Sequence, residues 1–253
     1  MAEFVTERVG ELRIERRSDA ALDAILGALK SPGEVLKQSH KSTARRVGDW
    51  VIKESRRNLS EYIKHVFHPS RYRAGWLAAR YLEERGIGVP EAVAYVERRC
   101  LGLMTGNAVV MEFLSGYVNV EEYARRLVAA GANAARVEAF LEGLAKAVGA
   151  LDAAGAYHSD LSGKNIFTRT GAEFRFIDLD GVVLGRKQTE AMRLLNHVQL
   201  YDSFCDLWDD SVLDPFLAPL IPADRDIEAW METVRAGQAA RRARTEAVWL
   251  RQA

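Results

Sequence analysis

The sequence has few cysteines, no excess of one charge and no long apolar run, and each of these absences narrows the class of protein. Its 253 residues include 2 cysteines, Cys100 and Cys205, without a second thiol or histidine at metal-ligand spacing, which indicates two reduced thiols rather than a disulfide framework or a zinc site. Lys and Arg total 35, as do Asp and Glu, which argues against a nucleic-acid binder that depends on neutralising phosphates. No window approaches the roughly 18 apolar residues of a spanning helix, and residues 1–4 do not begin a signal peptide. We therefore expect a cytoplasmic globular protein.

The zero net charge hides an uneven distribution along the chain. Residues 31–73 contain 10 Lys and Arg against 4 Asp and Glu, whereas residues 200–232 contain 9 acidic residues and a single basic one, Arg225. A basic segment of this kind is commonly a solvated surface, but it can also face phosphates, an anionic membrane or an acidic substrate.

Hydrophobic patterning predicts a first half that is rich in β-structure. Residues 18–30 have helical spacing, with Ser18 as the expected N-cap and Ser31-Pro32-Gly33 as the stop. A second helix is expected over residues 70–85, ended by Gly86. Strands are expected at residues 34–37, 44–47, 50–53, 92–97 and 108–113, the first three as an antiparallel meander.

After Gly116 the pattern becomes mainly helical. We expect helices over residues 121–130, 134–154 and most of 188–250, with turns at Asp214-Pro215 and at residues 219–222. Two short strands, residues 166–167 and 174–177, interrupt the helices and are joined by a turn that contains Gly171. The sequence thus predicts an α+β protein with a β-rich N-terminal lobe, residues 1–114, and a mainly helical C-terminal lobe, residues 115–253, which meet near residues 112–117.

The strongest chemical signal lies between the long helix and the short strands. The run His158-Ser159-Asp160-Leu161-Ser162-Gly163-Lys164-Asn165 matches the kinase catalytic-loop pattern H-R-D-L-x-x-x-N at every fixed position except the arginine. The apolar strand 176–177 then ends in Asp178, 13 residues after Asn165. Each feature alone is common in ordinary loops and strand ends, but their order and spacing together favour a phosphotransferase.

Phosphoryl transfer requires positioned groups and neutralised phosphate charge more than covalent help from the protein. We expect Asp160 to accept or orient the proton of the attacking hydroxyl. Asn165 and Asp178 would hold Mg²⁺ together with the phosphates of ATP, because Mg²⁺ prefers oxygen ligands. Lys164 would add a positive charge near the γ-phosphate. A loop followed by a tight hairpin would bring these side chains into one cleft.

Two further runs fit nucleotide binding. Trp50-Val51-Ile52-Lys53 resembles the V-A-I-K strand of kinases, whose lysine contacts the α- and β-phosphates. The apolar run 109–114 ends where the lobes should join, and the backbone groups of Glu112 and Leu114 could pair with the edge of adenine. An ordinary core strand with a polar end explains the second run nearly as well.

Taken together, these residues resemble the bacterial lipopolysaccharide-core sugar kinases, which phosphorylate Kdo or heptose and have a protein-kinase-like fold. The resemblance runs from about residue 35 to residue 195, and it includes the stretch 70–76 and the turn 85–90, which general kinases lack. It implies a protein-kinase-like two-lobe fold, Mg²⁺ and ATP as cofactors, and a glycolipid or sugar hydroxyl as acceptor. It also implies a cytoplasmic location beside the inner membrane, with peripheral membrane contact.

The chain departs from the kinase pattern at several positions. Residues 37–43, where a glycine-rich phosphate loop is expected, contain no glycine, so hydroxyls and Lys41 would have to replace the backbone cradle. The helix after Lys53 has no glutamate in its first half to pair with that lysine. Ser159 replaces the arginine that reads a phosphorylated activation loop, and no A-P-E segment follows Asp178, which favours a glycolipid or small-molecule kinase over a regulated protein kinase. Asp180 is the alternative metal ligand.

Two other functions stay open. A non-catalytic pseudokinase would explain the missing glycines, and a protein or antibiotic kinase could use the same scaffold with a different acceptor surface in residues 186–250. The basic strip 37–73, or a basic face made by Arg235, Arg241, Arg242 and Arg244, could lie against the bilayer. Nothing in the sequence specifies the oligomeric state.

Overall fold

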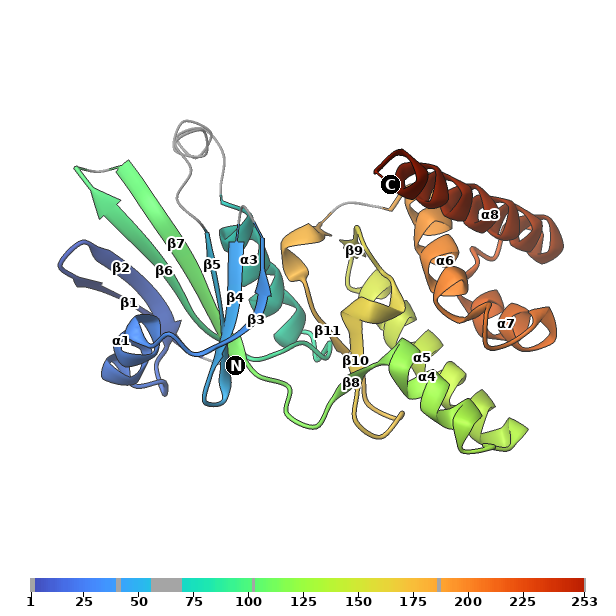
Figure 1. Ribbon diagram of the computed structural model, residues 1–253, viewed down its shortest axis with the longest axis horizontal. Coiled ribbons are helices and arrows are strands. Elements are labelled where there is room, and N and C mark those ends of the chain that lie inside the picture. The colour runs from blue at the N-terminus through green and yellow to red at the C-terminus, as the bar shows by residue number, and fades with distance from the viewer. Residues whose placement is uncertain (1–2, 40–41, 56–69, 102, 186–187, 253) are drawn as a thin grey trace. The chain divides into compact units, whose positions relative to one another are not determined.

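The structure, a computed structural model, describes residues 3–39, 42–55, 70–101, 103–185 and 188–252 (Figure 1). The chain divides into two compact units. The first comprises Met1–Gly116 together with Asp178–Val182, and the second comprises Tyr117–Ile177 together with Val183–Ala253. The segment Asp178–Val182, which begins with the predicted metal ligand, therefore belongs to the same unit as the N-terminal residues.

A seven-stranded antiparallel sheet dominates the first unit, with strand order β1-β2-β6-β7-β5-β4-β3. Its strands are β1 (Phe4–Val9), β2 (Leu12–Arg17), β3 (Glu34–Gln38), β4 (Ser42–Val47), β5 (Trp50–Ser55), β6 (Ala92–Cys100) and β7 (Leu103–Glu112). The five predicted strands and the β3–β4–β5 meander are confirmed. The β1–β2 hairpin was not predicted, because both strands are rich in charged residues and fully bury only Ile14.

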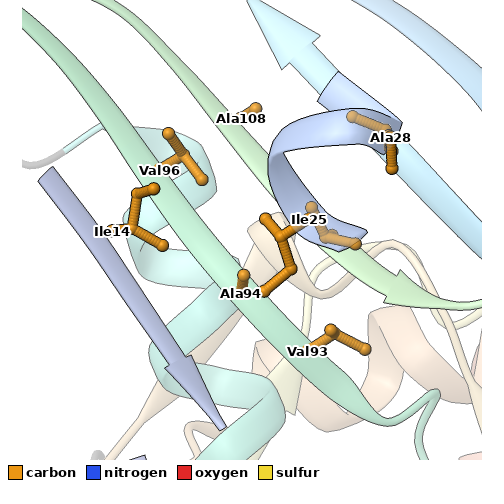
Figure 2. Close-up of a cluster of buried hydrophobic side chains, with 9 residues drawn as sticks. Ile14, Ile25, Ala28, Val93, Ala94, Val96 and Ala108 are labelled. Atoms are coloured by element: carbon orange, nitrogen blue, oxygen red, sulfur yellow. The ribbon is translucent and has the colours of Figure 1, made fainter. Parts of the chain in front are cut away.

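Helix α1 (Leu22–Lys30) packs on one face of this sheet. Ile25 and Ala28 enter a core of small and branched side chains from the strands, among them Ile14, Val93, Ala94, Val96 and Ala108 (Figure 2). The predicted cap by Ser18 is wrong, since the N-cap residue is Ala21 and no side chain caps the helix. Ser18 follows the end of β2 and donates its N–H to Glu3 O at 2.9 Å, which extends the β1–β2 pairing.

Helix α3 (Arg71–Glu83) covers the opposite face of the sheet. Successive side chains of a strand point to opposite faces, so neighbouring residues of one strand contact different helices. On β2, Ile14 lies in the core beneath α1, whereas the neighbouring Glu15 forms ion pairs with Arg73 and Arg80 of α3.

The limits of α3 agree with the sequence prediction. The side chain of Ser70 accepts a hydrogen bond from the N–H of Arg73 at 3.1 Å and so caps the helix. Gly86 follows the helix with a φ of 71°, a conformation that glycine adopts without steric cost.

The second unit is mainly helical. Its helices are α4 (Val120–Ala129), α5 (Ala134–Ala153), α6 (Glu190–Phe204), α7 (Asp210–Leu217) and α8 (Ile227–Gln252). Strands β8 (Val118–Asn119), β10 (Ile166–Thr168) and β11 (Arg175–Phe176) form a small antiparallel sheet. A further pair is formed by β9 (Ala156–His158) and β12 (Val182–Leu184). The single-turn 3-10 helices of this unit are η1 (Gly163–Asn165) and η3 (Ala218–Leu220), whereas η2 (Leu179–Gly181) belongs to the first unit.

Helix α7 corrects one prediction from the sequence. The expected turn at Asp214-Pro215 is wrong, because Pro215 lies inside α7. A proline within a helix removes one backbone hydrogen bond. Burial of Leu213, Phe216 and Leu217 on this helix compensates for that loss. Within the described residues, no helix combines the length and the apolar character that crossing a membrane would require.

Candidate active site

The predicted catalytic loop lies between β9 and β10 in the second unit. Asp160 is exposed to solvent, and the side chain of Asn165 holds it in place. Asn165 Nδ2 donates to the carbonyl oxygen and to Oδ2 of Asp160, both at 2.9 Å. Because the amide nitrogen is committed to these bonds, the amide oxygen of Asn165 is the atom left to bind a ligand. The structure thus brings Asp160 and Asn165 together, while Lys164 between them is exposed.

His158 is buried, with 1% of its surface exposed, and it connects the loop to the next strand. Its Nδ1 accepts a hydrogen bond from the N–H of Asp160 at 3.2 Å, so Nε2 carries the proton and donates to Ile177 O at 2.9 Å. Ile177 in turn donates its N–H to Asn165 O at 2.9 Å. The histidine of the motif therefore bonds to the backbone at both Asp160 and Ile177.

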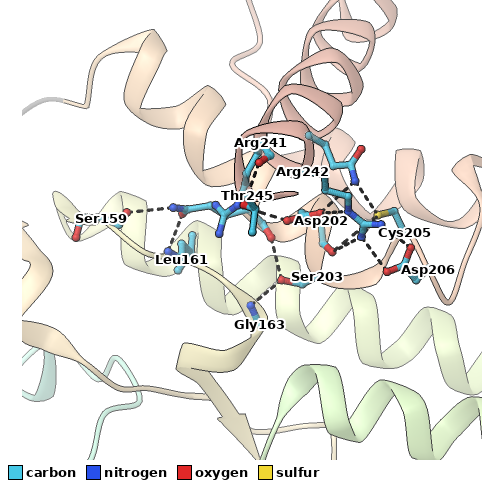
Figure 3. Close-up of polar contacts among 12 residues, drawn as sticks. Ser159, Leu161, Gly163, Asp202, Ser203, Cys205, Asp206, Arg241, Arg242 and Thr245 are labelled. Atoms are coloured by element: carbon cyan, nitrogen blue, oxygen red, sulfur yellow. Dashed lines mark hydrogen bonds and ion pairs between the residues drawn. The ribbon is translucent and has the colours of Figure 1, made fainter. Parts of the chain in front are cut away.

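Two residues of α6 that the sequence analysis missed also hold this loop. The side chain of Gln199 accepts from the N–H of Leu161 at 2.8 Å, and Ser203 Oγ accepts from the N–H of Gly163 at 2.8 Å (Figure 3). The signal that could have revealed them is a polar pair at i and i+4 within a helix whose neighbouring residues are buried.

In the first unit, successive side chains of β5 point to opposite faces of the sheet, so Lys53 points away from the core beneath α1. Ile52 is fully buried beneath α1, so Lys53 points to the face that α3 covers. Lys53 Nζ lies 3.0 Å from Asp178 Oδ1. Burial alone would raise the pKa of Asp178, but the ammonium group of Lys53 outweighs burial and holds this pKa below its usual range. The strand lysine and the predicted metal ligand are therefore direct partners.

The backbone of Asp178 has a φ of 59°, in the left-handed region that residues other than glycine seldom adopt. Such a conformation costs about 1–3 kcal/mol and is concentrated at functional sites. It directs the chain from Ile177 into η2, which packs against α3. Strain at this residue is independent support for a functional role of Asp178.

Asp180, the alternative metal ligand, is engaged by α3. Arg71 Nε lies 2.8 Å from Asp180 Oδ2, and 16% of the Asp180 side chain is exposed against 46% for Asp178. Burial and the neighbouring carboxylate of Asp178 raise the pKa of Asp180. Gly75 of α3 permits this close packing, because a Cβ at that position would lie 3.2 Å from the backbone nitrogen of Asp180. Asp178 is thus the more accessible carboxylate and the more readily ionised one.

The donors in both units suit Mg²⁺ chemically. In the described part of the chain, no three His, Cys, Asp or Glu side chains form a group that could hold a metal ion by themselves. Mg²⁺ does not need such a cage, since it usually binds one or two carboxylates together with substrate phosphates and water. The carboxylate of Asp178 and the amide oxygen of Asn165 are hard oxygen donors of this kind.

Glu112 and Leu114, the two residues expected to bind adenine, differ in which backbone groups are available for that binding. Glu112 donates its N–H to Glu91 O at 2.9 Å, and its carboxylate accepts from the N–H of Glu91 at 3.1 Å. The N–H of Glu112 is therefore occupied, and only its carbonyl can serve a nucleotide. Leu114 is buried, and its N–H has no backbone acceptor among the residues that the structure describes.

Within the glycine-free segment, Ser39 follows the end of β3 and Ser42 begins β4. Ser42 donates its N–H to Ser39 Oγ at 3.0 Å, and the two hydroxyls lie 3.0 Å apart. These hydroxyls therefore hold the ends of β3 and β4 together. Phosphate binding by the same hydroxyls, which the sequence suggested, would have to replace these contacts. His40 and Lys41, which belong to the same prediction, lie outside the described residues.

Most of the basic groups that were proposed to face a membrane and that the structure describes have acidic partners within their own unit. In the strip 37–73, these pairs are Arg45–Glu54, Lys53–Asp178, Arg71–Asp180 and Arg73–Glu15. On α8 they are Arg235–Asp214, Arg241–Asp202 and Arg242–Asp206. The acidic segment 200–232 thus pairs with three arginines of α8, and these paired residues do not form an open basic patch.

Comparisons with known proteins identify the family and the fold of the chain. The model of the Lipopolysaccharide kinase (Kdo/WaaP) family matches residues 37–211. The solved structure of WaaP in complex with acyl carrier protein is similar with a TM-score of 0.63 and 22% identity, covering 88% of this chain and 91% of that one. A crystal structure of WbdD has a TM-score of 0.51 and 17% identity, covering 81% of this chain and 46% of that one. No curated protein matches the sequence. At these identities the solved structures establish the fold, and the predicted protein-kinase-like α+β fold is confirmed.

Proposed function

Because the chain belongs to the lipopolysaccharide kinase (Kdo/WaaP) family, we propose that it phosphorylates a sugar hydroxyl of the lipopolysaccharide inner core, on Kdo or heptose, with ATP as the phosphate donor. Membership of this family makes the chain a kinase. Ser159 in place of the arginine of regulated protein kinases supports a glycolipid acceptor over a protein.

The observation that carries the proposal is the exposed carboxylate of Asp160, which Asn165 Nδ2 holds at 2.9 Å. A carboxylate that is fixed but open to solvent is suited to act as a general base. In the proposed reaction, Asp160 accepts the proton of the sugar hydroxyl. The hydroxyl oxygen bonds to the γ-phosphorus of ATP, and the bond from that phosphorus to the departing ADP oxygen breaks.

The other site residues have distinct roles in this proposal. Asn165 and Asp178 hold Mg²⁺, which when bound neutralises phosphate charge. Lys53 contacts the α- and β-phosphates, and Lys164 adds positive charge near the transferred group. The carbonyl of Glu112 and the N–H of Leu114 pair with adenine. The contact of Lys53 with Asp178 and the amide orientation of Asn165 support these assignments.

The acceptor also suggests where the protein works. Lipid A anchors inner-core lipopolysaccharide in a membrane, so a kinase that acts on it must reach the membrane surface. We place the protein on the cytoplasmic side of the inner membrane as a peripheral protein. The support for this location is the acceptor, since the arginines of α8 are paired with acidic residues.

Mass spectrometry of three acceptor classes tests the proposal. The purified protein is incubated with Mg²⁺ and ATP and with Kdo-lipid A, heptosylated core, casein or an aminoglycoside. Because the solved WaaP structure contains acyl carrier protein, each reaction is run with and without that protein. We expect one added phosphate on a glycolipid and a rate lower by on the order of 10²-fold for Asp160→Asn. Phosphate on casein or the aminoglycoside alone, or a wild-type rate for Asp160→Asn, would contradict the proposal.

A further inference from the structure

The side chain of Gln199 spans the two peptide groups that flank Asp160. Its oxygen accepts from the N–H of Leu161 at 2.8 Å, and its nitrogen donates to Ser159 O at 3.1 Å. Gln199 is 5% exposed; its bond to Leu161 is buried and its bond to Ser159 is partly buried. A buried bond of this kind costs about 1–3 kcal/mol when one partner is removed and the other is left unpaired. The carboxamide therefore fixes the backbone on each side of the catalytic carboxylate.

Ser203 continues this contact one helical turn further along α6. Its hydroxyl accepts from the N–H of Gly163 at 2.8 Å and donates to Gln199 O at 2.8 Å (Figure 3). Glycine at position 163 leaves room for this approach, because a Cβ there would lie 2.7 Å from Glu121 Cγ and 3.1 Å from Ser203 Cβ. One face of α6 thus binds the loop backbone at residues 159, 161 and 163.

Further contacts join α6 to α8. Arg242 Nε donates to Asp202 Oδ1 at 2.7 Å, and Arg242 Nη1 donates to Asp206 Oδ1 at 2.8 Å (Figure 3). Gln238 Nε2 donates to Asp202 Oδ1 at 3.1 Å. Helix α6 is therefore fixed to α8 through these residues while Gln199 and Ser203 hold the loop.

We infer that Gln199 is a positioning residue for phosphoryl transfer, which sets the location of Asp160 by bonding the peptide groups before and after it. The inference rests on the proposed function, in which Asp160 is the base. It requires a carboxamide specifically, because the side chain must accept from an N–H at one end and donate to a carbonyl at the other. A glutamate at this position would keep the acceptor but present a carboxylate to the carbonyl of Ser159.

Steady-state kinetics of two variants and a matched control test this inference. Gln199→Met keeps the length of the side chain without its hydrogen bonds, and Gln199→Glu keeps the acceptor alone. Gln238→Met is the control, since Gln238 also donates to α6 but contacts Asp202 and Cys205 instead of the loop. Misplacing a reacting group by a fraction of an ångström to 1 Å can cost up to about 10²-fold in rate. We expect both Gln199 variants to lower kcat by on the order of tenfold or more, with the KM for ATP within about twofold of wild type.

The control separates positioning from general destabilisation. Gln238→Met should keep both the kcat and the KM of the wild type, and thermal unfolding establishes that each variant is folded. If either Gln199 variant is folded and retains the wild-type kcat, or if Gln238→Met lowers kcat equally, the inference is wrong.

Hydrogen exchange gives a readout that does not depend on activity. We expect the amide of Leu161 to exchange at least about tenfold faster in Gln199→Met than in the wild type, because its acceptor is gone. Unchanged exchange would overturn the inference even if the kinase is active. A wild-type protein that phosphorylates no glycolipid would instead contradict the proposed function, so the two failures are distinct.

Discussion

Lys53 Nζ lies 3.0 Å from Asp178 Oδ1, although 125 positions separate the two residues in the sequence. The contact joins the strand lysine expected at the phosphates to the carboxylate expected at the metal. Because an adjacent positive charge favours the ionised form of a carboxyl group, Lys53 keeps Asp178 negatively charged. An ionised carboxylate is the form that binds Mg²⁺.

Replacing Lys53 with Met should lower kcat/KM by on the order of 10²-fold, the scale seen when a charge-stabilising group is removed from an active site. The change removes a cation from the phosphates and leaves the half-buried carboxylate of Asp178 without its partner. Steady-state kinetics with ATP as the varied substrate measures the effect. Lys146→Met on α5 is the control, since that lysine is 79% exposed and pairs with Glu142 on the surface. If Lys53→Met is as active as Lys146→Met, then Lys53 has no role in the active site.

Asp178→Asn and Asp180→Asn should differ in nucleotide binding. Asp178 is the more exposed carboxylate, whereas Asp180 is held by Arg71. We therefore expect Asp178→Asn to weaken Mg²⁺-dependent ATP binding by at least on the order of tenfold, with a smaller effect of Asp180→Asn. Calorimetric titration of each variant with ATP, at several Mg²⁺ concentrations, gives the comparison. The opposite order would transfer the metal role to Asp180.

Gly75→Ala should destabilise the protein, against the general trend for helices. Alanine in place of a helical glycine normally stabilises by roughly 0.5–1 kcal/mol. At position 75, however, the new Cβ would lie 3.2 Å from the nitrogen and 3.3 Å from the Cα of Asp180. We expect the free energy of unfolding to fall by about 1 kcal/mol or more, with lower activity because Asp178 is nearby in the chain.

Gly27→Ala in α1 is the matched control for this change. A Cβ at Gly27 meets nothing within 4 Å, so this variant should gain the usual roughly 0.5–1 kcal/mol. Urea denaturation of both variants measures the difference. If Gly75→Ala is as stable as Gly27→Ala, then α3 and Asp180 are not packed as closely as the structure indicates.

The sequence predicted those features whose signal is local. The spacing of residues 158–165 predicted that Asp160 and Asn165 act together, and the structure places their side chains in contact. Short β-compatible runs between polar turns located β3–β5, and the helical pattern located α3 and α5. The β1–β2 hairpin escaped prediction because its strands carry many charged residues and because β2 pairs with the distant strand β6. The low helix propensity of proline predicts a turn at Pro215, whereas the burial of its neighbours keeps it inside α7.

Contacts between distant residues could not be predicted in this way. The partner of Lys53 was sought on the following helix, but among the described residues it is Asp178, and Glu83 of that helix pairs with Arg17. Gln199 lies 40 positions from Ser159, and no local pattern links a helix residue to a loop at that separation. Such pairs depend on the tertiary fold, which brings α6 to the loop and η2 to β5.

We expect the buried side chain of His197 to make the free energy of unfolding depend on pH. Trp230 Nε1 donates to His197 Nδ1 at 2.8 Å, and burial, together with nearby Arg193, lowers the pKa of His197 from 6.5 to about 4. Between these values the unfolded chain binds a proton that the folded protein does not, so the free energy of unfolding falls as pH decreases, by at most about 1.4 kcal/mol per unit.

Urea denaturation near pH 7, 6 and 5 tests this dependence. His197→Asn should reduce the loss of stability over this range, because asparagine does not titrate and its Oδ1 can still accept from Trp230. The difference between the two proteins isolates His197, since the carboxyl groups that titrate near pH 5 are the same in both. If the stability of His197→Asn falls as steeply as that of the wild type, then His197 is not the neutral, buried acceptor that its contact with Trp230 indicates.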